Sequence, residues 1–333
     1  MLNMIDGCLR NINYLRISIT DRCNLRCTYC MPKEGLSLLG NDDILRYEEI
    51  LRVVNVAVEI GITKVRITGG EPLVRRGVVD FVSQLSSIPG LKDISLTTNG
   101  ILLERFAHAL FEAGIKRINI SLDSLNPEKY AKITRGGNLA DVLKGIEAVN
   151  QVGFSPIKIN VVAIKDTNED EILDFAVLSL KKPFQIRFIE LMPLGQAGLQ
   201  YEGKYLSNDV IYQRINNFYP LVPVAGRENN TDGPARIYKI EGSQGEIGFI
   251  SPISRHFCNI CNRLRLTADG HLRACLLTDN DVSLKAALRN NHRNEELKNI
   301  ISSVIAGKPS QHEISHEENH IRKCVKEMSS LGG

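Results

Sequence analysis

The feature that most constrains the fold is an alternation of apolar strands and amphipathic helices between residues 15 and 190. Strands are predicted at residues 15–19, 64–68, 93–97, 116–122, 156–164 and 184–190. Helices, several of them closed by glycine, are predicted at residues 47–60, 78–86, 102–112, 139–152 and 169–180. Such alternation predicts parallel strands joined by right-handed crossovers, and six strands are too few to close an eight-stranded barrel.

Polar residues gather where these strands are expected to end. They fall at residues 23–30, 69–71, 97–99, 121–123 and 190–192. Core packing does not require polar groups at those places, whereas α/β folds bind ligands at the carboxyl ends of their strands. The pattern therefore predicts one shared site.

A triplet of thiols follows the first strand. Cys23, Cys27 and Cys30 lie within eight residues, and neither Cys nor His follows before His108. Soft thiolates select zinc, copper(I) or iron–sulfur iron. The missing fourth ligand favours a [4Fe–4S] cluster with one open iron, while a redox Cys27/Cys30 pair, a zinc knuckle and a disulfide remain alternatives.

Composition narrows the setting. The 333 residues carry a net charge of +3, which gives no argument for nucleic acid or an anionic membrane as partner. The chain has neither a signal-like start nor about eighteen consecutive apolar residues, so we expect a cytoplasmic protein. In that reducing compartment cysteines are expected to be metal or redox ligands rather than disulfides; six of the eight fall in two triplets, and Cys8 and Cys324 are expected to be bystanders.

A second thiol triplet lies near the carboxyl end. Cys258, Cys261 and Cys275 again lack a fourth Cys nearby, and a Cys3His zinc site with His256 or His271 is the alternative to a second cluster. Three arginines accompany them, namely Arg263, Arg265 and Arg273. Guanidinium groups bind phosphate oxygens bidentately, so the row suits a polyphosphate ligand, and a solvated basic face is the alternative. The chain has no P-loop pattern.

Three histidines, His312, His316 and His320, follow helical spacing among glutamates. They are expected to lie on a solvated helix face rather than to hold a metal.

The two kinds of motif resemble the radical S-adenosylmethionine (SAM) superfamily, which places three thiols before a Gly69-Gly70-Glu71-Pro72 loop that binds the amino group of SAM. Within it the chain resembles the GTP 3′,8-cyclase family of molybdenum cofactor biosynthesis over nearly its whole length. The matching stretches are residues 21–27, 66–73, 97–100, 119–123, 187–190, 233–236, 258–266 and the terminal Gly332-Gly333.

The resemblance implies an open partial (βα)6 barrel of the TIM type in residues 1–200, with a first [4Fe–4S] cluster. Residues 201–333 would form an α+β domain with a second [4Fe–4S] cluster and the Gly-Gly tail.

The resemblance also implies roles for individual residues. Cys23, Cys27 and Cys30 would hold the first cluster, and Cys258, Cys261 and Cys275 the second. The expected SAM contacts are Tyr29, Gly70, Ser121 and Met192. The expected GTP contacts are Arg16, Arg66, Thr97, Lys158, Arg263 and Arg265. The expected catalytic group comprises Arg263, Arg265, Gly332 and Gly333, with the tail inserted into the site.

The implied reaction is the radical cyclisation of GTP to (8S)-3′,8-cyclo-7,8-dihydroguanosine 5′-triphosphate. Implied partners are a flavodoxin- or ferredoxin-type electron donor and the next enzyme, cyclic pyranopterin monophosphate synthase. The chain could be a monomer or a homodimer. A two-cluster radical SAM enzyme acting on a peptide, or a zinc-stabilised binding module without catalysis, are the alternatives.

Overall fold

Six parallel strands form the centre of the protein. The computed structural model describes residues 4–195, 201–224, 233–290, 293–312, 314, 324 and 326–332. The central strands are β1 (Tyr14–Ser18), β2 (Lys64–Thr68), β3 (Asp93–Thr98), β4 (Arg117–Ser121), β5 (Ile157–Ala163) and β6 (Phe184–Glu190). They pair in chain order, every pair parallel, which confirms the six predicted strands to within one or two residues.

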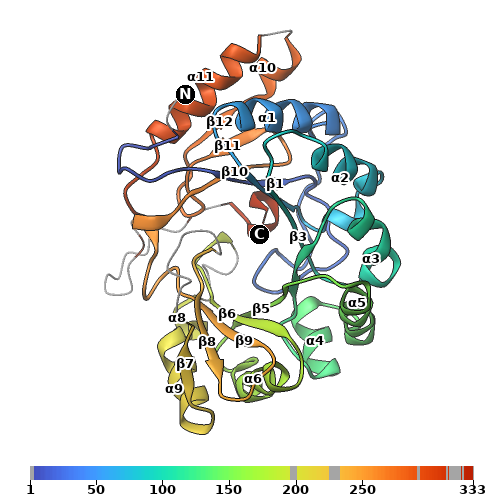
Figure 1. The fold of residues 1–333 in the computed structure, drawn as a ribbon, viewed down its shortest axis with the longest axis vertical. Coiled ribbons are helices and arrows are strands. Elements are labelled where there is room, and N and C mark those ends of the chain that lie inside the picture. Colours follow the sequence, from blue (N-terminus) through green and yellow to red (C-terminus); the bar gives the residue numbers. More distant parts are fainter. Residues whose placement is uncertain are drawn as a thin grey trace.

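Helices cover the outer face of this sheet (Figure 1). They are α1 (Tyr47–Glu59), α2 (Val78–Ser86), α3 (Leu103–Glu112), α5 (Leu139–Val152) and α6 (Ile172–Lys181), all expected from the sequence. An additional helix, α4 (Pro127–Thr134), was missed. Its start was readable, because Asn126 caps the backbone N–H groups of Glu128 and Lys129 and a proline occupies the first turn.

Alternation along each strand separates the core from the interior of the arc. On β1, Leu15 and Ile17 are fully buried in the hydrophobic core together with the apolar stripe of α1. Tyr14 and Arg16, one residue out of phase, line a cavity on the other face. The sheet therefore has a packed outer side and a polar inner side.

The carboxyl-terminal part of the chain extends the sheet at both edges. Next to β6 lie β9 (Glu246–Ile250), β8 (Arg236–Ile240) and β7 (Leu221–Pro223), and next to β1 lie β10 (Arg263–Leu266), β11 (His271–Arg273) and β12 (Asp281–Ser283). Both β9 and β10 pair in parallel with the barrel strands. The result is an open sheet, and the expected division at residue 200 stays a prediction.

The remaining helices are α8 (Tyr201–Lys204), α9 (Asn208–Phe218), α10 (Lys285–Arg289), α11 (Asn294–Ala306) and α12 (Met328–Leu331). Helix α11 packs near α1 and the N-terminus, where Lys298 Nζ lies 2.8 Å from a Glu59 carboxylate oxygen (Figure 1). Helix α12 lies in the middle of the view, inside the arc of strands. Helices α11 and α12 therefore belong to different regions of the fold.

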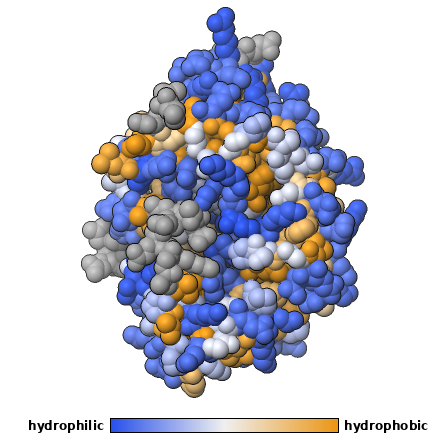
Figure 2. Space-filling model, in the orientation of Figure 1, coloured by the Kyte–Doolittle hydropathy of each residue, from blue (hydrophilic) through white to orange (hydrophobic). Residues whose placement is uncertain are grey.

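Figure 2 shows the same face as a hydrophilic surface in which hydrophobic residues emerge in separate patches. Every helix in the described part of the chain is too short or too polar to traverse a bilayer.

Candidate active site

One cavity inside the arc of strands contains both thiol triplets. It is lined by Cys23, Cys27, Cys30, Cys258, Cys261 and Cys275. None of these cysteines is in a disulfide, so that alternative is wrong. The fold therefore brings the two triplets to one cavity.

The two triplets lie at opposite ends of the strands. Cys23 follows β1, whereas Cys261 lies two residues before β10, whose Arg263 pairs with Tyr14 at the start of β1. At about 3.3 Å per residue, five-residue β1 separates the two ends by roughly 15 Å. The carboxyl-end rule thus predicted only half of the site, because an arc that does not close leaves its interior open from end to end.

The loop of the first triplet is held by backbone contacts with the end of β2. The Gly70 N–H donates to the Thr20 carbonyl oxygen (2.7 Å) and the Glu71 N–H to that of Arg22 (2.8 Å). A Cβ on Gly70 would collide with the Arg22 carbonyl oxygen. Glycine at this position is therefore required by the close approach of two backbones.

The Glu71 side chain is buried, and the expected contact of this loop with the amino group of SAM stays a prediction. The Glu71 carboxylate accepts hydrogen bonds from the Leu73 N–H (3.0 Å), the Thr98 hydroxyl (2.7 Å) and the Asn99 N–H (2.7 Å). Burial raises its pKa to about 7 despite these donors. The side chain braces the ends of β2 and β3, and the glycine backbone is what lines the cavity.

The first three thiols are built for a cationic group. Burial raises the pKa of Cys23 and of Cys27, and burial together with Cys23 raises the pKa of Cys30 to about 12. Arg26 lowers the pKa of Cys23 by less than burial raises it, so thiolates here need further positive charge, which bound iron would supply. This chemistry fits an iron–sulfur cluster.

The second triplet has a more cationic setting. Burial would raise the pKa of Cys261, but Arg263 and Lys308 outweigh it and hold this pKa at about 7. The histidines of the zinc alternative do not line the cavity: His256 is exposed, and His271 Nδ1 lies 3.0 Å from the Asp269 carboxylate. Across the described residues, no three Cys, His, Asp or Glu side chains converge on a point that would suit a single ion.

His312 does line the cavity, and its expected place on a solvated helix face is wrong. It is 8% exposed and lies outside any helix. Its Nε2 lies 2.8 Å from the Pro252 carbonyl oxygen, and its Nδ1 accepts from the Ile314 N–H (3.2 Å). Both ring nitrogens are used, so His312 is not a spare metal ligand. His316 and His320 lie outside the described residues.

Sheet register creates a row of arginines between the triplets. Arg16 on β1 pairs with Arg265 on β10 and with Arg66 on β2, and all three line the cavity. Burial and the neighbouring Arg265 and Arg66 lower the pKa of Arg16, and burial and Arg263 lower that of Arg265 to about 10. Like charges held together in a buried place favour an anionic ligand.

Two uncharged side chains also contribute polar atoms to the cavity lining. Thr97 Oγ1 and Asn160 Oδ1 are buried with no hydrogen-bond partner in the part of the chain that the structure describes. Buried polar atoms in proteins are normally paired. Asn160 and Arg187 were not predicted as site residues. Each is next to a buried apolar residue on its strand, Ile159 and Phe188, and this alternation could have indicated that they face the cavity.

The four expected SAM contacts all line the cavity, namely Tyr29, Gly70, Ser121 and Met192. The Tyr29 hydroxyl donates to Asp123 (2.7 Å), which also accepts from the Val162 N–H (2.8 Å). Burial raises the pKa of Asp123 to about 6. Asp123 thereby fixes Tyr29 beside the first triplet.

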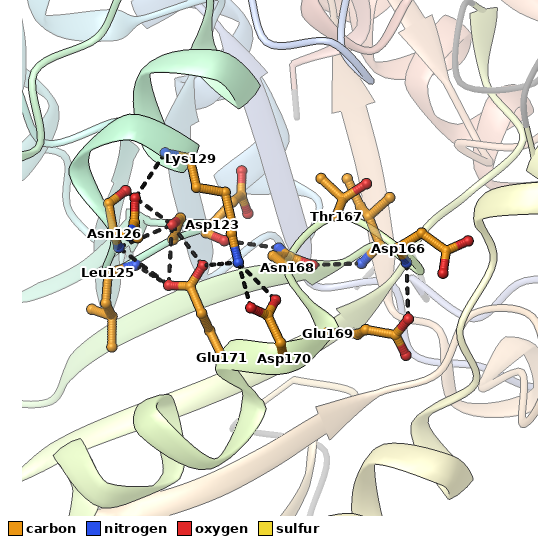
Figure 3. A network of polar contacts seen from close by, with 12 residues as sticks. Asp123, Leu125, Asn126, Lys129, Asp166, Thr167, Asn168, Glu169, Asp170 and Glu171 are labelled. Carbon is orange, nitrogen blue, oxygen red and sulfur yellow. Dashed lines mark hydrogen bonds and ion pairs between the residues drawn. The ribbon is translucent and has the colours of Figure 1, made fainter.

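A polar network behind Asp123 holds the loop that carries it (Figure 3). Asn168 donates to the Asp123 carbonyl oxygen (2.8 Å), and Glu171 accepts from the N–H groups of Leu125 (2.6 Å) and Asn126 (3.2 Å). Lys129 closes the network with ion pairs to Asp170 and Glu171. The loop after β4 is therefore fixed from both sides.

Gly332 and Lys158 are not among the residues that line the cavity. Arg265 Nη1 donates to the Gly332 carbonyl oxygen (2.7 Å), and Met328 and Ser329 of α12 line the cavity. Lys158 is buried on β5, opposite Asn119, and its contact with GTP stays a prediction. Gly333 lies outside the described residues.

Comparison with known proteins decides the family. Residues 17–178 match the Radical SAM superfamily and residues 184–314 match Molybdenum Cofactor Synthesis C. A protein of Moorella thermoacetica named GTP 3′,8-cyclase is 50% identical over 330 residues, covering 99% of this chain and 100% of that protein. One of the same name from Alkaliphilus oremlandii is 49% identical over 327 residues, covering 97% and 98%.

The chain belongs to the GTP 3′,8-cyclase family. Among solved structures, SuiB of Streptococcus suis bound to S-adenosylmethionine has a TM-score of 0.55 at 15% identity, covering 87% of this chain and 68% of that one. That likeness shows the fold alone and confirms the open radical SAM barrel. The GTP 3′,8-cyclase relatives match from end to end, so the family covers both halves of the cavity.

Proposed function

We propose that this chain is a radical SAM GTP 3′,8-cyclase. It converts GTP to (8S)-3′,8-cyclo-7,8-dihydroguanosine 5′-triphosphate, the first step of molybdenum cofactor biosynthesis. The observation that carries this proposal is a single cavity with a thiol triplet at each end and three paired arginines between them. The relatives named GTP 3′,8-cyclase agree with it.

Two [4Fe–4S] clusters and SAM are the cofactors. Cys23, Cys27 and Cys30 hold the first cluster, and Cys258, Cys261 and Cys275 the second. When bound, the first cluster and SAM supply a primary carbon radical, generated by reductive cleavage of the sulfonium. Tyr29, Gly70, Ser121 and Met192 hold SAM against the loop that Asp123 braces.

GTP occupies the space between the clusters. It carries about four negative charges at neutral pH. Arg16, Arg66, Arg263 and Arg265 neutralise them, and the Thr97 hydroxyl supplies an uncommitted polar group. Lys158 adds a buried cation at the register of Asn119, next to Thr97. Because no P-loop pattern is present, the triphosphate is bound rather than hydrolysed.

The chain contributes placement to the reaction. A primary radical attacks the nearest C–H bond, so the ribose C3′ hydrogen must be held close to the radical carbon and C8 of guanine close to C3′. Arg263 and Arg265 fix the substrate together with the Gly332-Gly333 tail, of which Gly333 lies outside the described residues. The hydrogen bond from Arg265 to the Gly332 carbonyl oxygen joins the two parts of this catalytic group.

The test is anaerobic turnover of the reconstituted protein with SAM, dithionite and GTP deuterated at C3′. Deuterium is expected in 5′-deoxyadenosine. Unlabelled 5′-deoxyadenosine formed together with product would refute abstraction at C3′, and absence of the cyclised nucleotide would refute the function.

The physiological setting is part of the proposal. The enzyme works in the cytoplasm with a low-potential flavodoxin- or ferredoxin-type donor and passes its product to cyclic pyranopterin monophosphate synthase. The peptide alternative is not favoured, because the full-length relatives are named GTP 3′,8-cyclases. SuiB, which has been solved with a precursor peptide, resembles this chain in fold alone.

A further inference from the structure

A buried arginine near the N-terminus contacts the loop of the second triplet. Residues 5–11 form a tight turn in which Asp6 accepts from the backbone N–H (2.9 Å) and from Nε (2.6 Å) of Arg10. Arg10 is 6% exposed, and its Nη1 donates to the Cys258 carbonyl oxygen (2.7 Å). One guanidinium thus connects the start of the chain with the backbone of a cysteine of the second triplet.

The same guanidinium also fixes the segment after α11. It donates to the carbonyl oxygens of Lys308 (3.3 Å), Pro309 (2.7 Å) and Ser310 (3.1 Å). Three successive carbonyl groups therefore point at Arg10, and the Lys308 backbone has a defined position beside the Cys258 loop.

The Lys308 side chain lies between the two segments that carry Cys261 and Cys275. It is 5% exposed, and its Nζ donates to the carbonyl oxygens of Arg263 (3.0 Å) and Ala274. Arg263 lies two residues after Cys261, and Ala274 directly precedes Cys275. A single ammonium group therefore joins the two segments that carry these thiols.

Burial lowers the pKa of Lys308, so its positive charge depends on nearby negative groups. Its largest favourable electrostatic partners are the Cys261 and Cys275 thiols, while burial and Arg10 act against its charged form. A buried ammonium group is costly unless a negative group compensates it. A purely structural tie between two carbonyl groups would need only a neutral donor, so the positive charge itself calls for an explanation.

We propose that Lys308, set in place by Arg10, is a positioning residue of the second cluster. It ties the Cys261 and Cys275 segments together and supplies a fixed positive charge that favours the more negative, reduced form of the cluster. This rests on the proposed function only in taking the second triplet to hold a [4Fe–4S] cluster.

The decisive comparison is Lys308→Met, which removes the charge, with Lys308→Arg, which retains it. Lys144→Met on the exposed side of α5 is the matched control. Each substitution is placed in the full chain with Cys23, Cys27 and Cys30 changed to Ala, so that only the second cluster loads. The readouts are the iron and sulfide content, the rate of iron loss to a chelator, and the midpoint potential from a redox titration followed by electron paramagnetic resonance.

Lys308→Met is expected to lose iron faster and to shift the one-electron equilibrium about tenfold toward the oxidised form, which is about 59 mV toward lower potential. Lys308→Arg is expected to restore the potential. Arg10→Met should change the potential in the same direction as Lys308→Met, because it releases the segment that places Lys308.

An unchanged potential in a fully loaded Lys308→Met chain, equal to that of Lys144→Met, would overturn the proposal. If Lys308→Met retains no second cluster, the iron content of Lys308→Gln is compared with that of Lys308→Arg. A cluster retained only in Lys308→Arg supports a role for the charge, and equal retention in the two variants refutes it. SAM binding to chains with an intact first triplet reports on folding. No arm of the experiment uses GTP, so its outcome is independent of whether the cyclisation is correctly assigned.

Discussion

The tail position Gly332 gives the most sharply defined prediction. Its backbone is in the left-handed region, with φ of +75°. A Cβ added there would lie 2.6 Å from Thr68 Oγ1 and 2.9 Å from Ser18 Cβ, both on barrel strands. Gly332→Ala therefore meets both a conformational and a steric obstacle.

The two costs can be estimated separately. An alanine in the left-handed region costs about 1 kcal/mol, and inserting a methyl group into a filled space costs about 2 kcal/mol. Together they disfavour the seated tail by about 3 kcal/mol, roughly a hundredfold in the ratio of seated to released tail. The Arg265 hydrogen bond to the Gly332 carbonyl oxygen is lost with it.

Two assays report on the tail. Cyclisation under single-turnover conditions should slow by up to a hundredfold in Gly332→Ala, and trypsin should cleave after Lys326 correspondingly faster, because the ion pair of Lys326 with Asp281 belongs to the seated tail. Thermal unfolding of the barrel should be unchanged, since the tail is terminal.

Gly242→Ala is the matched control. Gly242 also has a positive φ, of +73°, but nothing lies within 4 Å of an added Cβ. It should lose about 1 kcal/mol of overall stability and keep full cyclisation. Normal turnover and normal tail protection in Gly332→Ala would refute the tight seating, and an equal loss of turnover in Gly242→Ala would show that the defect is not specific to the tail.

Three further predictions concern the cavity. Arg66→Lys should raise the KM for GTP about tenfold while leaving SAM binding intact, because an ammonium group cannot bind phosphate oxygens bidentately; an unchanged KM would remove Arg66 from the phosphate site. Cys275→Ala should lose the second cluster, seen as about half the iron per chain, and still bind SAM; full iron content would exclude Cys275 as a ligand. The Glu71 carboxyl, with its pKa raised to about 7, holds more proton in the folded than in the unfolded chain between pH 4.5 and 7, so its contribution to stability falls as pH rises through that window. Urea unfolding of Glu71→Gln should show a flatter pH dependence there and a loss of about 1–3 kcal/mol at pH 7, and an unaltered slope would contradict the buried acid.

The elements of the barrel were predictable because their signals are local. Apolar periodicity and closing glycines located β1 to β6 and five helices, and the thiol spacings located both triplets. The histidine stretch shows the limit of such signals, because helical spacing placed His312 on a solvated surface, whereas a contact with Pro252, 60 residues away, buries it. Arg10 and Lys308 illustrate the same limit, since their partners lie up to 300 residues away along the chain.

The arginine row depends on register, which a sequence does not display. A one-residue slip of β10 against β1 would turn Arg265 away from the cavity, and an apolar neighbour would face the cavity instead. The apolar residues Leu15, Leu264 and Ile17 fix that register, because they must remain in the core. The packing of the apolar residues in the core thus determines where the arginines lie on the cavity side of the sheet.

The length of β1 links the fold to the chemistry. Its two ends lie beside the two triplets, roughly 15 Å apart, and Arg16 occupies the middle position on the cavity side. A nucleotide that extends from one triplet to the other would pass Arg16. The length of β1 therefore sets how long the substrate must be, and the Arg16 guanidinium favours a substrate with negative charge. A closed eight-stranded barrel would fill this interior with side chains. The open arc is therefore what leaves a single cavity between the two thiol triplets.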